Sequence, residues 1–298
     1  MSQPASVVTI GVFDGVHSGH RALIDLAVSL ARTEGLRPAA VTFDPHPMTV
    51  LRGLDIPLLA TVERRKQLLA QEGIEFVHVC DFTPDRAAQE PQAFIDDVLI
   101  GKCNAQIVVI GEGFRFGSKA SGNANTLCEA GLIVHEVPAV HAGIDRVSST
   151  RIRGALIEGD ATEARELLGR PHRLEGKVMH GNKRGRTIGY PTANLGVAHG
   201  LLIPADGVYA GWVLRGDLST EPQRLPAAIS IGTNPTFDDV IERRVEAYVL
   251  DRTDLDLYDE YIAVDFHSRI RGMLKFNGID ELVTAMDRDV EQVRALLA

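Results

Sequence analysis

Two histidines three residues apart, His17 and His20, stand in the stretch of the sequence best suited to chemistry. They follow an apolar run at 7–10 that predicts a short buried strand. From His20 onward, apolar residues recur at three- and four-residue spacing, which predicts a helix. A helix start offers unpaired N–H groups and a positive dipole end, so this stretch favours a phosphate, whose oxygens the two imidazoles can contact.

The histidine pair has two other interpretations, a metal site and exposed helix caps. A His-x-x-His pair can bind a metal, but no cysteine or third histidine lies nearby in the sequence. The histidines can also be plain exposed helix caps, although two histidines that bracket a glycine after a strand are unusual for that role. Gly15 and Gly19 allow the backbone to approach a ligand closely, which fits a phosphate site best.

The elements around this stretch predict a doubly wound α/β domain. Strands are expected at 39–43, 76–80, 106–110 and 132–137, with helices at 61–73 and 91–99 between them. Asp44 and His46 lie in a proline-rich loop after the second strand, at the end where open parallel sheets bind ligands. On the helix at 61–73, we expect the charged residues Glu63 to Lys66 to form a solvated face.

Two further loops leave predicted strand ends. The loop 111–117 has three glycines and an arginine, with Phe114 and Phe116 able to stack on a ring; a plain surface turn is the alternative. In the stretch 146–153, Ser149 or Thr150 can cap a helix that ends at Gly159. Hydroxyls, free N–H groups and arginines then meet at one helix start, which predicts a second phosphate site.

The pattern changes at 168–172, which predicts domains at 1–169 and 170–298. Short β-rich runs follow at 174–180, 208–214, 225–231, 244–250 and 261–266, separated by turn residues. They predict an antiparallel, barrel-like domain. Apolar residues of 279–297 mark one face of a final helix, which we expect to pack on the barrel.

Two stretches of this second domain could carry chemistry. The basic, glycine-rich run 181–194 is no Walker loop, yet it can offer N–H groups and charge to ATP phosphates, and Thr192 can place a hydroxyl on Mg²⁺. Alone, such a loop is more often a turn. Glu246 interrupts an apolar and aromatic strand, and alternation by itself favours a place on the solvent face.

Bulk composition narrows the function classes. The 298 residues are 45% hydrophobic and 24% charged, as in a soluble globular protein, and the formal net charge of −9 argues against a nucleic-acid partner. Three cysteines without a CxxC motif predict a reduced, cytoplasmic protein. With no signal peptide and no apolar run of membrane-spanning length, we expect no membrane association. Self-association stays open.

The motifs together resemble one family over nearly the whole chain. FDGVHSGH, FDPHP, GEGFRFG and RVSSTRIR, then GRTIGYPTAN, DGVYAG, SIGTNPTF, EAYVLD and DLYDEYIAVDFHSRIR, follow in order the bacterial bifunctional riboflavin kinase/FMN adenylyltransferases, also called FAD synthetases. The resemblance implies a Rossmann-like nucleotidyltransferase domain followed by an antiparallel β-barrel domain with a C-terminal helix. It also implies two ATP-dependent reactions: riboflavin to FMN with release of ADP, and FMN to FAD with release of pyrophosphate.

The resemblance also assigns residues to roles. As catalytic or charge-stabilising residues it implies Glu246, His17, His20, Arg146, Ser149 and Thr150. As substrate- or nucleotide-binding residues it implies Gly11, Phe13, Asp14, Gly15, Gly19, Asp44, His46, Gly111, Phe114, Phe116, Arg153, Gly181, Lys183, Gly185, Arg186, Thr192 and Asn194, with Thr192 and Asn194 also on Mg²⁺.

The chain departs from the family pattern at two positions. Gly113 replaces a polar residue of the 111–117 loop, and Met273 stands where the family often has glutamate. The first departure raises an alternative, a riboflavin kinase with a weakened adenylyltransferase domain. A non-catalytic flavin-binding regulator is a second alternative, against which the intact Thr192, Asn194 and Glu246 argue.

Overall fold

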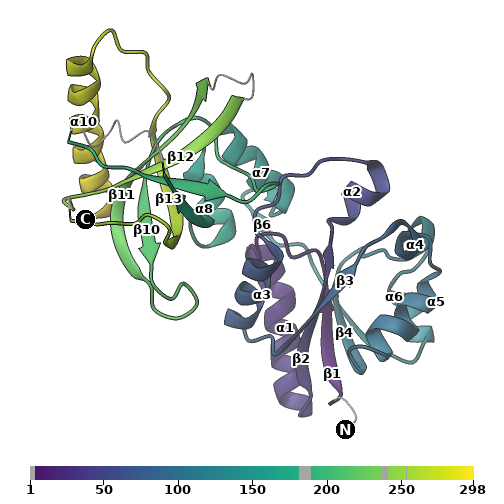
Figure 1. Ribbon diagram of the computed structural model, residues 1–298. Coiled ribbons are helices and arrows are strands. Elements are labelled where there is room, and N and C mark those ends of the chain that lie inside the picture. Colours follow the sequence, from purple (N-terminus) through teal and green to yellow (C-terminus); the bar gives the residue numbers. More distant parts are fainter. Residues whose placement is uncertain (1–3, 181–188, 236–240, 253) are drawn as a thin grey trace. The chain divides into compact units, whose positions relative to one another are not determined.

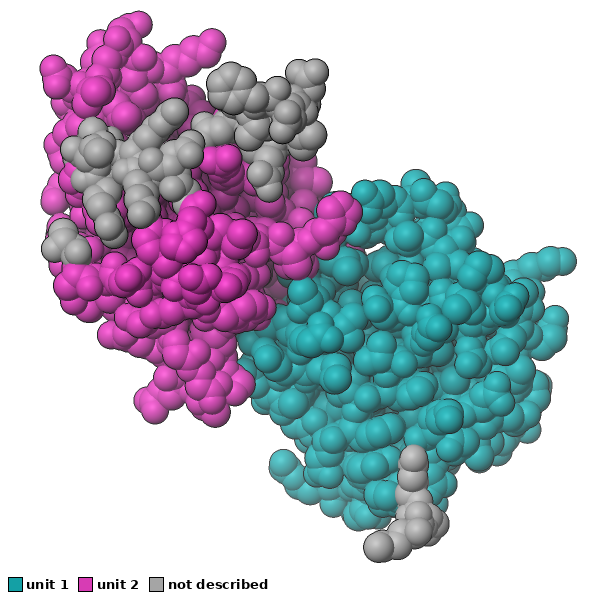
Figure 2. Space-filling model, viewed as in Figure 1, with its two compact units in different colours: residues 1–149 teal, residues 150–298 magenta. Residues whose placement is uncertain are grey.

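The computed structural model describes residues 4–180, 189–235, 241–252 and 254–298. It divides into two compact units, residues 1–149 and 150–298, shown in different colours in Figure 2. The first unit is α/β and the second contains a closed barrel, as the sequence predicts.

The first unit is built on a five-stranded parallel sheet in the order β3-β2-β1-β4-β5 (Figure 1). Its strands are β1 (Ser6–Ile10), β2 (Arg37–Asp44), β3 (Phe76–Asp81), β4 (Ala105–Gly111) and β5 (Ile133–Val137). Its helical segments are α1 (Ser18–Glu34), α2 (Pro47–Arg52), α3 (Val62–Gln71), α4 (Pro84–Ala87), α5 (Pro91–Phe94), η1 (Ile95–Ile100), η2 (Ser118–Ala120) and α6 (Ala124–Glu129). A short hairpin follows, β6 (His141–Ala142) and β7 (Asp145–Arg146).

Helices cover both faces of this sheet. Val7 and Val109 pack with Ala27 and Ala31 of α1 on one face, whereas Val8 packs with residues of η1 and α6 on the other. Strands buried on both faces are apolar nearly throughout, and all five residues of β1 are buried. The sheet core therefore follows from the apolar runs that predicted the strands.

The strand order brings the candidate loops to one edge. Because all five strands are parallel, their carboxyl ends meet at the same edge of the sheet. The neighbours β1 and β4 are not consecutive in the chain, so the strand order reverses between them, and such a point is where open α/β sheets bind ligands. The loops 11–17, 44–46 and 111–117 follow β1, β2 and β4 at this edge.

The second unit contains most of α7 (Ser149–Glu158), then α8 (Ala161–Leu168) and a barrel that closes in the order β10-β11-β12-β9-β8-β13. The strands are β8 (His172–Met179), β9 (Ala193–Val197), β10 (Gly207–Arg215), β11 (Gln223–Pro235), β12 (Ile241–Val249) and β13 (Tyr261–Arg271). The sequence predicted all of them except β9. Closure leaves no free sheet edge among these strands.

Alternation organises the barrel wall. Val245, Ala247 and Val249 of β12 point into the barrel core, so Glu246 and Tyr248 point outward. The final helix, α10 (Ile279–Leu297), packs on that outer side through Val293, as the sequence predicted. The outer face of β12 is therefore partly covered by a helix.

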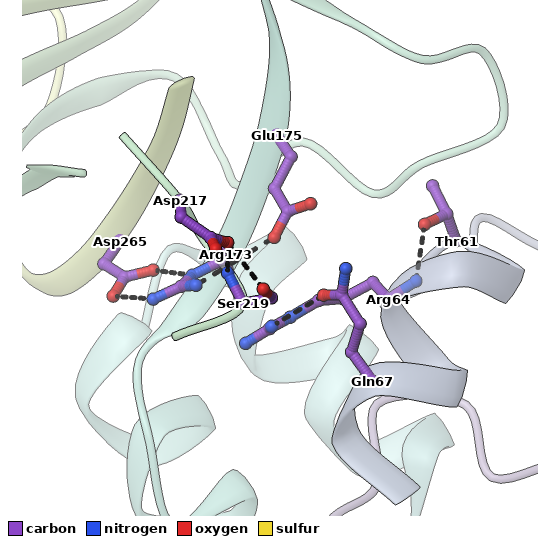
Figure 3. Close-up of polar contacts among 8 residues, drawn as sticks. All are labelled: Thr61, Arg64, Gln67, Arg173, Glu175, Asp217, Ser219 and Asp265. Atoms are coloured by element: carbon purple, nitrogen blue, oxygen red, sulfur yellow. Dashed lines mark hydrogen bonds and ion pairs between the residues drawn. The ribbon is translucent and has the colours of Figure 1, made fainter. Parts of the chain in front are cut away.

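Polar side-chain contacts stabilise helices and strands within each unit (Figure 3). In the barrel, Arg173 of β8 forms a two-point ion pair with Asp265 of β13, at 2.6 and 2.9 Å. In the first unit, the Thr61 hydroxyl caps α3 by accepting the Arg64 N–H at 3.1 Å. Helix α8 joins the barrel core through Ala161 and has Leu167 and Leu168 buried.

Candidate active sites

His17 is the N-cap of α1 rather than a residue inside its first turn. Its Nδ1 accepts the backbone N–H of His20 at 3.3 Å, and its side chain is only 5% exposed. Since Nδ1 is the acceptor, Nε2 carries the ring proton in the neutral tautomer. His17 can therefore present one N–H donor while it orders the start of the helix.

The two imidazoles stack on each other. Their centroids are 3.6 Å apart with an interplanar angle of 14°, and Phe13 contacts His20 edge-on at 5.2 Å. A Cβ on Gly19 would come within 3.1 Å of the His17 ring, so glycine at this position leaves room for the imidazole. The sequence assigned Gly19 to ligand approach, and its packing reason becomes visible only in the structure.

Asp14 ties the loop after β1 to a distant segment. Its carboxylate is 1% exposed and accepts the N–H groups of Leu59 and Ala60 at 2.9 and 3.1 Å. Its carbonyl accepts the Ser149 hydroxyl at 2.9 Å, although 135 residues separate the two. The structure thus brings together the first and last predicted phosphate-binding stretches of this unit.

Two of the other predicted ligand contacts, Phe13 and Phe116, have buried side chains, and two more pack beside them. Phe13 is fully buried in the core beside α1 and α3, and Phe116 is 9% exposed and packs on Phe94, with ring centroids 5.6 Å apart. Phe114 stacks on Phe116 at 5.8 Å. Gly11 has Phe13 as its close neighbour, because a Cβ there would lie 3.1 Å from that ring. These side chains hold the loops in shape.

The loop after β2 leads into α2, and Arg65 forms hydrogen bonds with the end of β2. His46 is the N-cap of α2 and accepts the Met48 N–H through Nδ1 at 3.1 Å, while Asp44 is exposed at the strand end. Arg65 of α3 donates to the Thr42 hydroxyl and to the Phe43 carbonyl, both at 2.9 Å. Burial lowers the pKa of Arg65, against the raising effect of the nearby Asp14 and Asp44 carboxylates.

The expected solvated face of α3 is therefore wrong at two positions. Arg64 is 8% exposed and Arg65 is 1% exposed. An arginine can be buried when its guanidinium finds acceptors. The end of β2 supplies them for Arg65, and Gln67 of the same helix accepts from Arg64 at 3.1 Å. No spacing in the sequence marked Arg65, because the polar run looked uniform.

The remaining candidates of this unit lie in loops or at strand ends, where Gly15 is buried and Gly113 is exposed. Gly15 has a φ of 80° and Gly113 a φ of 72°, both in the left-handed region that favours glycine. Gly111 and Gly113 have open space where a Cβ would stand. Arg146 ends the hairpin strand β7 and is exposed. Gly111 and Gly113 thus leave room at the carboxyl end of β4.

Helix α7 starts at Ser149, so Ser149 and Thr150 lie inside the helix and neither is the N-cap that the sequence predicted. The Ser149 hydroxyl donates to the Asp14 carbonyl instead. Thr150 and Arg153 lie in its first turns, and Thr150 is exposed. Arg151 points to another partner, since it forms an ion pair with Glu163 of α8 at 2.7 Å.

In the barrel, strand pairing gathers the predicted kinase residues. Glu246 of β12 lies opposite Asn194 of β9 on one side and opposite Ser230 of β11 on the other. The Thr192 hydroxyl lies 3.4 Å from Glu246 Oε2, within reach of a hydrogen bond. A hydroxyl, an amide and a carboxylate thus come together, although 54 residues separate Thr192 from Glu246.

These residues line a cavity of about 410 Å³ in the second unit. Its polar wall includes Thr192, Asn194 and Glu246, and α10 faces them with apolar side chains. The apolar lining residues are Val208, Ala228, Met273, Leu274, Phe276, Leu282, Met286 and Val290. Volume and lining fit a flat organic ring with a polar tail. Glu246 therefore points outward, as alternation predicted, but into a cavity rather than bulk solvent.

A second, smaller cavity shares Thr192 and Asn194 with the first. Its other lining residues include Ala247 and Val249 from the inward face of β12, together with Arg252 and Tyr258. Thr192 and Asn194 therefore stand between two cavities. The predicted loop residues Gly181, Lys183, Gly185 and Arg186 lie outside the described residues.

Sequence reasoning missed several residues of the larger cavity. Tyr190, Arg244 and Tyr248 line it beside Glu246. The alternation of β12 carried a signal, because positions 244, 246 and 248 share one face of the strand. Met273, the second departure from the family pattern, also lines this cavity and packs near Gly232.

The fold and its candidate sites are those of a two-unit transferase, with a sheet edge in one unit where the predicted phosphate-binding loops gather and a carboxylate beside a cavity in the other. Family models agree with this division: one described as FAD synthetase matches residues 1–151, and one described as riboflavin kinase matches residues 168–297. The chain belongs to the family of bifunctional riboflavin kinase/FMN adenylyltransferases.

Relatives with that name match along almost the whole chain. The protein of Listeria monocytogenes is 38% identical over 98% of this chain and 92% of its own length. The protein of Bacillus subtilis is 36% identical over 97% and 92%, respectively.

A crystal structure from Streptococcus pneumoniae has the same fold, with a TM-score of 0.89 and 36% identity over 99% of this chain and 95% of that one. That structure is described as a macrolide-efflux protein. Among the residues described in the present structure, no helix is long and apolar enough to cross a membrane.

Proposed function

We propose that this chain phosphorylates riboflavin to FMN in its second unit and adenylylates FMN to FAD in its first. Family membership over both halves supports the pair of reactions. The observation that carries the kinase assignment is the meeting of Thr192, Asn194 and Glu246 at a cavity with one apolar wall.

In the kinase reaction, the riboflavin 5′-hydroxyl attacks the γ-phosphorus of ATP and ADP leaves. Glu246 accepts the hydroxyl proton, since an alcohol is a poor nucleophile at neutral pH. The apolar wall under α10 holds the flavin ring, and the smaller cavity across Thr192 and Asn194 receives part of the nucleotide. The two substrates then meet at the residues that the cavities share.

Thr192 and Asn194 supply a hydroxyl and an amide oxygen, which are donors that Mg²⁺ accepts. When bound, Mg²⁺ supplies positive charge against the phosphate oxygens. Among the described residues no cluster of three or more His, Cys, Asp or Glu side chains offers a metal site, and Thr192 and Asn194 are the residues that would hold the ion beside the ATP phosphates.

In the adenylyltransferase reaction, a phosphate oxygen of FMN attacks the α-phosphorus of ATP and pyrophosphate leaves. FMN is already anionic, so no protein base is needed. His17, His20, Arg146, Ser149, Thr150 and Arg153 position the phosphates and stabilise charge. The Ser149–Asp14 hydrogen bond supports this assignment, because it joins the start of α7 to the loop after β1.

The structure suggests a positioning role for some residues first assigned to nucleotide binding. Asp14, Phe13 and Phe116 have buried side chains, so in this proposal they shape loops whose backbone contacts the nucleotide. Gly11, Gly15, Asp44, His46, Gly111 and Phe114 keep their proposed contacts with substrate at the same edge. The unpaired cysteines Cys80, Cys103 and Cys128 support a cytoplasmic protein.

The domain boundary at 169/170 belongs to the same proposal. The kinase family model begins at residue 168, near that boundary, whereas the compact units divide after Ser149 and α8 packs on the barrel. A kinase domain that starts at 170 would lack α7 and α8.

One product assay tests the proposal. The chain is incubated with riboflavin, ATP and Mg²⁺, and FMN and FAD are separated by chromatography. Formation of both products is expected. FMN without FAD would identify a riboflavin kinase with a weakened first unit, and bound but unconverted riboflavin would identify a regulator.

A further inference from the structure

Tyr190 connects the proposed kinase site to the C-terminal helix. Its hydroxyl donates to the carboxylate of Asp287 on α10. Its ring meets the ring of Tyr248 on β12, with centroids 5.0 Å apart and planes at 62°. Both tyrosines line the larger cavity. This contact joins three segments: the chain before β9, the strand β12 and the helix α10.

Thr192 needs support from outside the strand ladder. The pairing of β9 with β12 starts at Ala193, so Thr192 stands just before the first paired residue. Its hydroxyl is 3.4 Å from Glu246 Oε2, at the long limit of a hydrogen bond. The position of Thr192 therefore depends on the residues that precede it.

Pro191 makes the link from Tyr190 to Thr192 stiff. The proline ring fixes its own φ near −65°, and it restricts the preceding residue to extended backbone. A displacement of Tyr190 is therefore passed on to Thr192 rather than absorbed by free rotation between them.

Tyr248 extends the contact from Tyr190 to the strand that carries Glu246. It lies two positions after Glu246 on β12, so both side chains stand on one face of the strand. Tyr190 lies two residues before Thr192, so the contact between the two tyrosines links the segments that carry Thr192 and Glu246.

The Tyr190 hydroxyl stays a donor at neutral pH. Burial, followed by the bond to Asp287, raises the pKa of Tyr190 to about 12, which keeps its hydroxyl protonated.

We propose that Tyr190 is a positioning residue for phosphoryl transfer, and that its bond to Asp287 uses α10 to hold Thr192 against Glu246. The role rests on the kinase site proposed above. It makes α10 more than a wall of the cavity, because the helix then sets the geometry of reacting groups that it does not touch. Small misplacements of such groups are costly in rate.

A set of conservative variants tests this role in the full chain. Tyr190→Phe keeps the ring contact and deletes the donor, and Asp287→Ala deletes the acceptor. Asp287→Asn keeps an acceptor oxygen. We expect kcat for riboflavin phosphorylation to fall about tenfold in the first two variants, with KM for riboflavin and ATP changing by about twofold or less. The double variant should fall no further, and Asp287→Asn should stay near the parent.

Controls separate this role from general stability. Tyr261→Phe deletes a hydroxyl from an exposed tyrosine on β13 and should leave kcat unchanged. FAD formation from supplied FMN should persist in every variant, and thermal unfolding is measured for each. Asp287 is exposed, so its variants should fold even where a tyrosine variant does not.

Three results would overturn the proposal. One is a kcat of Tyr190→Phe within about twofold of the parent, and another is a double variant whose loss is the product of the single losses. In both cases, if Glu246→Gln is inactive, the assignment of the kinase site still holds and only the role of Tyr190 is ruled out. The third is a Glu246→Gln variant with parental kcat, which would remove the kinase-site assignment itself.

Discussion

Replacement of Asp14 by alanine should destabilise the first unit and leave the barrel unchanged. The Asp14 carboxylate is 1% exposed and satisfies the N–H groups of Leu59 and Ala60. Without it, two buried donors lose their acceptor, at about 1–3 kcal/mol each, so the first unit should lose about 2–6 kcal/mol of unfolding free energy. Asp14→Asn keeps one acceptor oxygen and should lose less.

The single tryptophan makes this prediction measurable in the intact chain. Trp212 lies on β10 of the second unit, so its fluorescence reports unfolding of the barrel, whereas far-UV circular dichroism reports both units. In Asp14→Ala, the dichroism transition of the first unit should move to lower temperature while the fluorescence transition stays. Asp55→Ala, at an exposed loop position, is the matched control and should change neither.

The kinetics of the same variants separate packing from ligand contact. At a temperature where the protein is folded, Asp14→Asn should keep KM for ATP in FAD formation close to the parent value. An unchanged dichroism transition together with a strongly raised KM for ATP would show instead that the carboxylate contacts the nucleotide directly.

Three further predictions concern the division of labour between the units. His20→Ala should reduce FAD formation about 10²–10³-fold and leave FMN formation intact, as measured by chromatography of both products; equal loss of both would contradict it. Gly113→Asn should raise FAD formation, because it adds an amide at a position that has open space and a φ of 72°, which asparagine tolerates. Gly113→Ala adds no amide and should not raise FAD formation. Equal rates of FAD formation in the two variants would argue against a role of the amide. Fragments 150–298 and 170–298 should both phosphorylate riboflavin. The shorter fragment lacks the buried residues Leu167 and Leu168 of α8, so its free energy of unfolding in denaturant should be lower by about 3–6 kcal/mol. Equal stability of the two fragments would show that α8 is dispensable.

The periodic features of the sequence were enough to predict most of the fold. Apolar runs gave the parallel strands, and three- and four-residue spacing gave α1 and α10. The strand β9 was missed because Ala193–Val197 is short and contains a glycine, so its pattern is weak beside the motif that precedes it. Existence of an element is encoded locally, whereas a short strand forms only because its neighbours pair with it.

The candidate sites show the same limit. Residue types at strand ends predicted where the loops gather, since parallel strands end at one edge. They could not show that Asp14 and Arg65 turn inward, because a buried polar group depends on partners that come from distant segments. Alternation placed Glu246 on the outer face of the barrel correctly, but the cavity there exists only because α10 covers that face.

In the proposed mechanism, Glu246 is the base of a kinase site that is separate from the adenylyltransferase site. The most direct measurement is kcat for riboflavin phosphorylation by Glu246→Gln at saturating ATP and Mg²⁺, with FAD formation from supplied FMN measured in the same preparation. Glutamine keeps the size and polarity of the side chain but cannot accept the proton. We expect Glu246→Gln to lose most kinase turnover and to retain FAD formation, whereas a kinase kcat within about twofold of the parent would show that Glu246 is not the base.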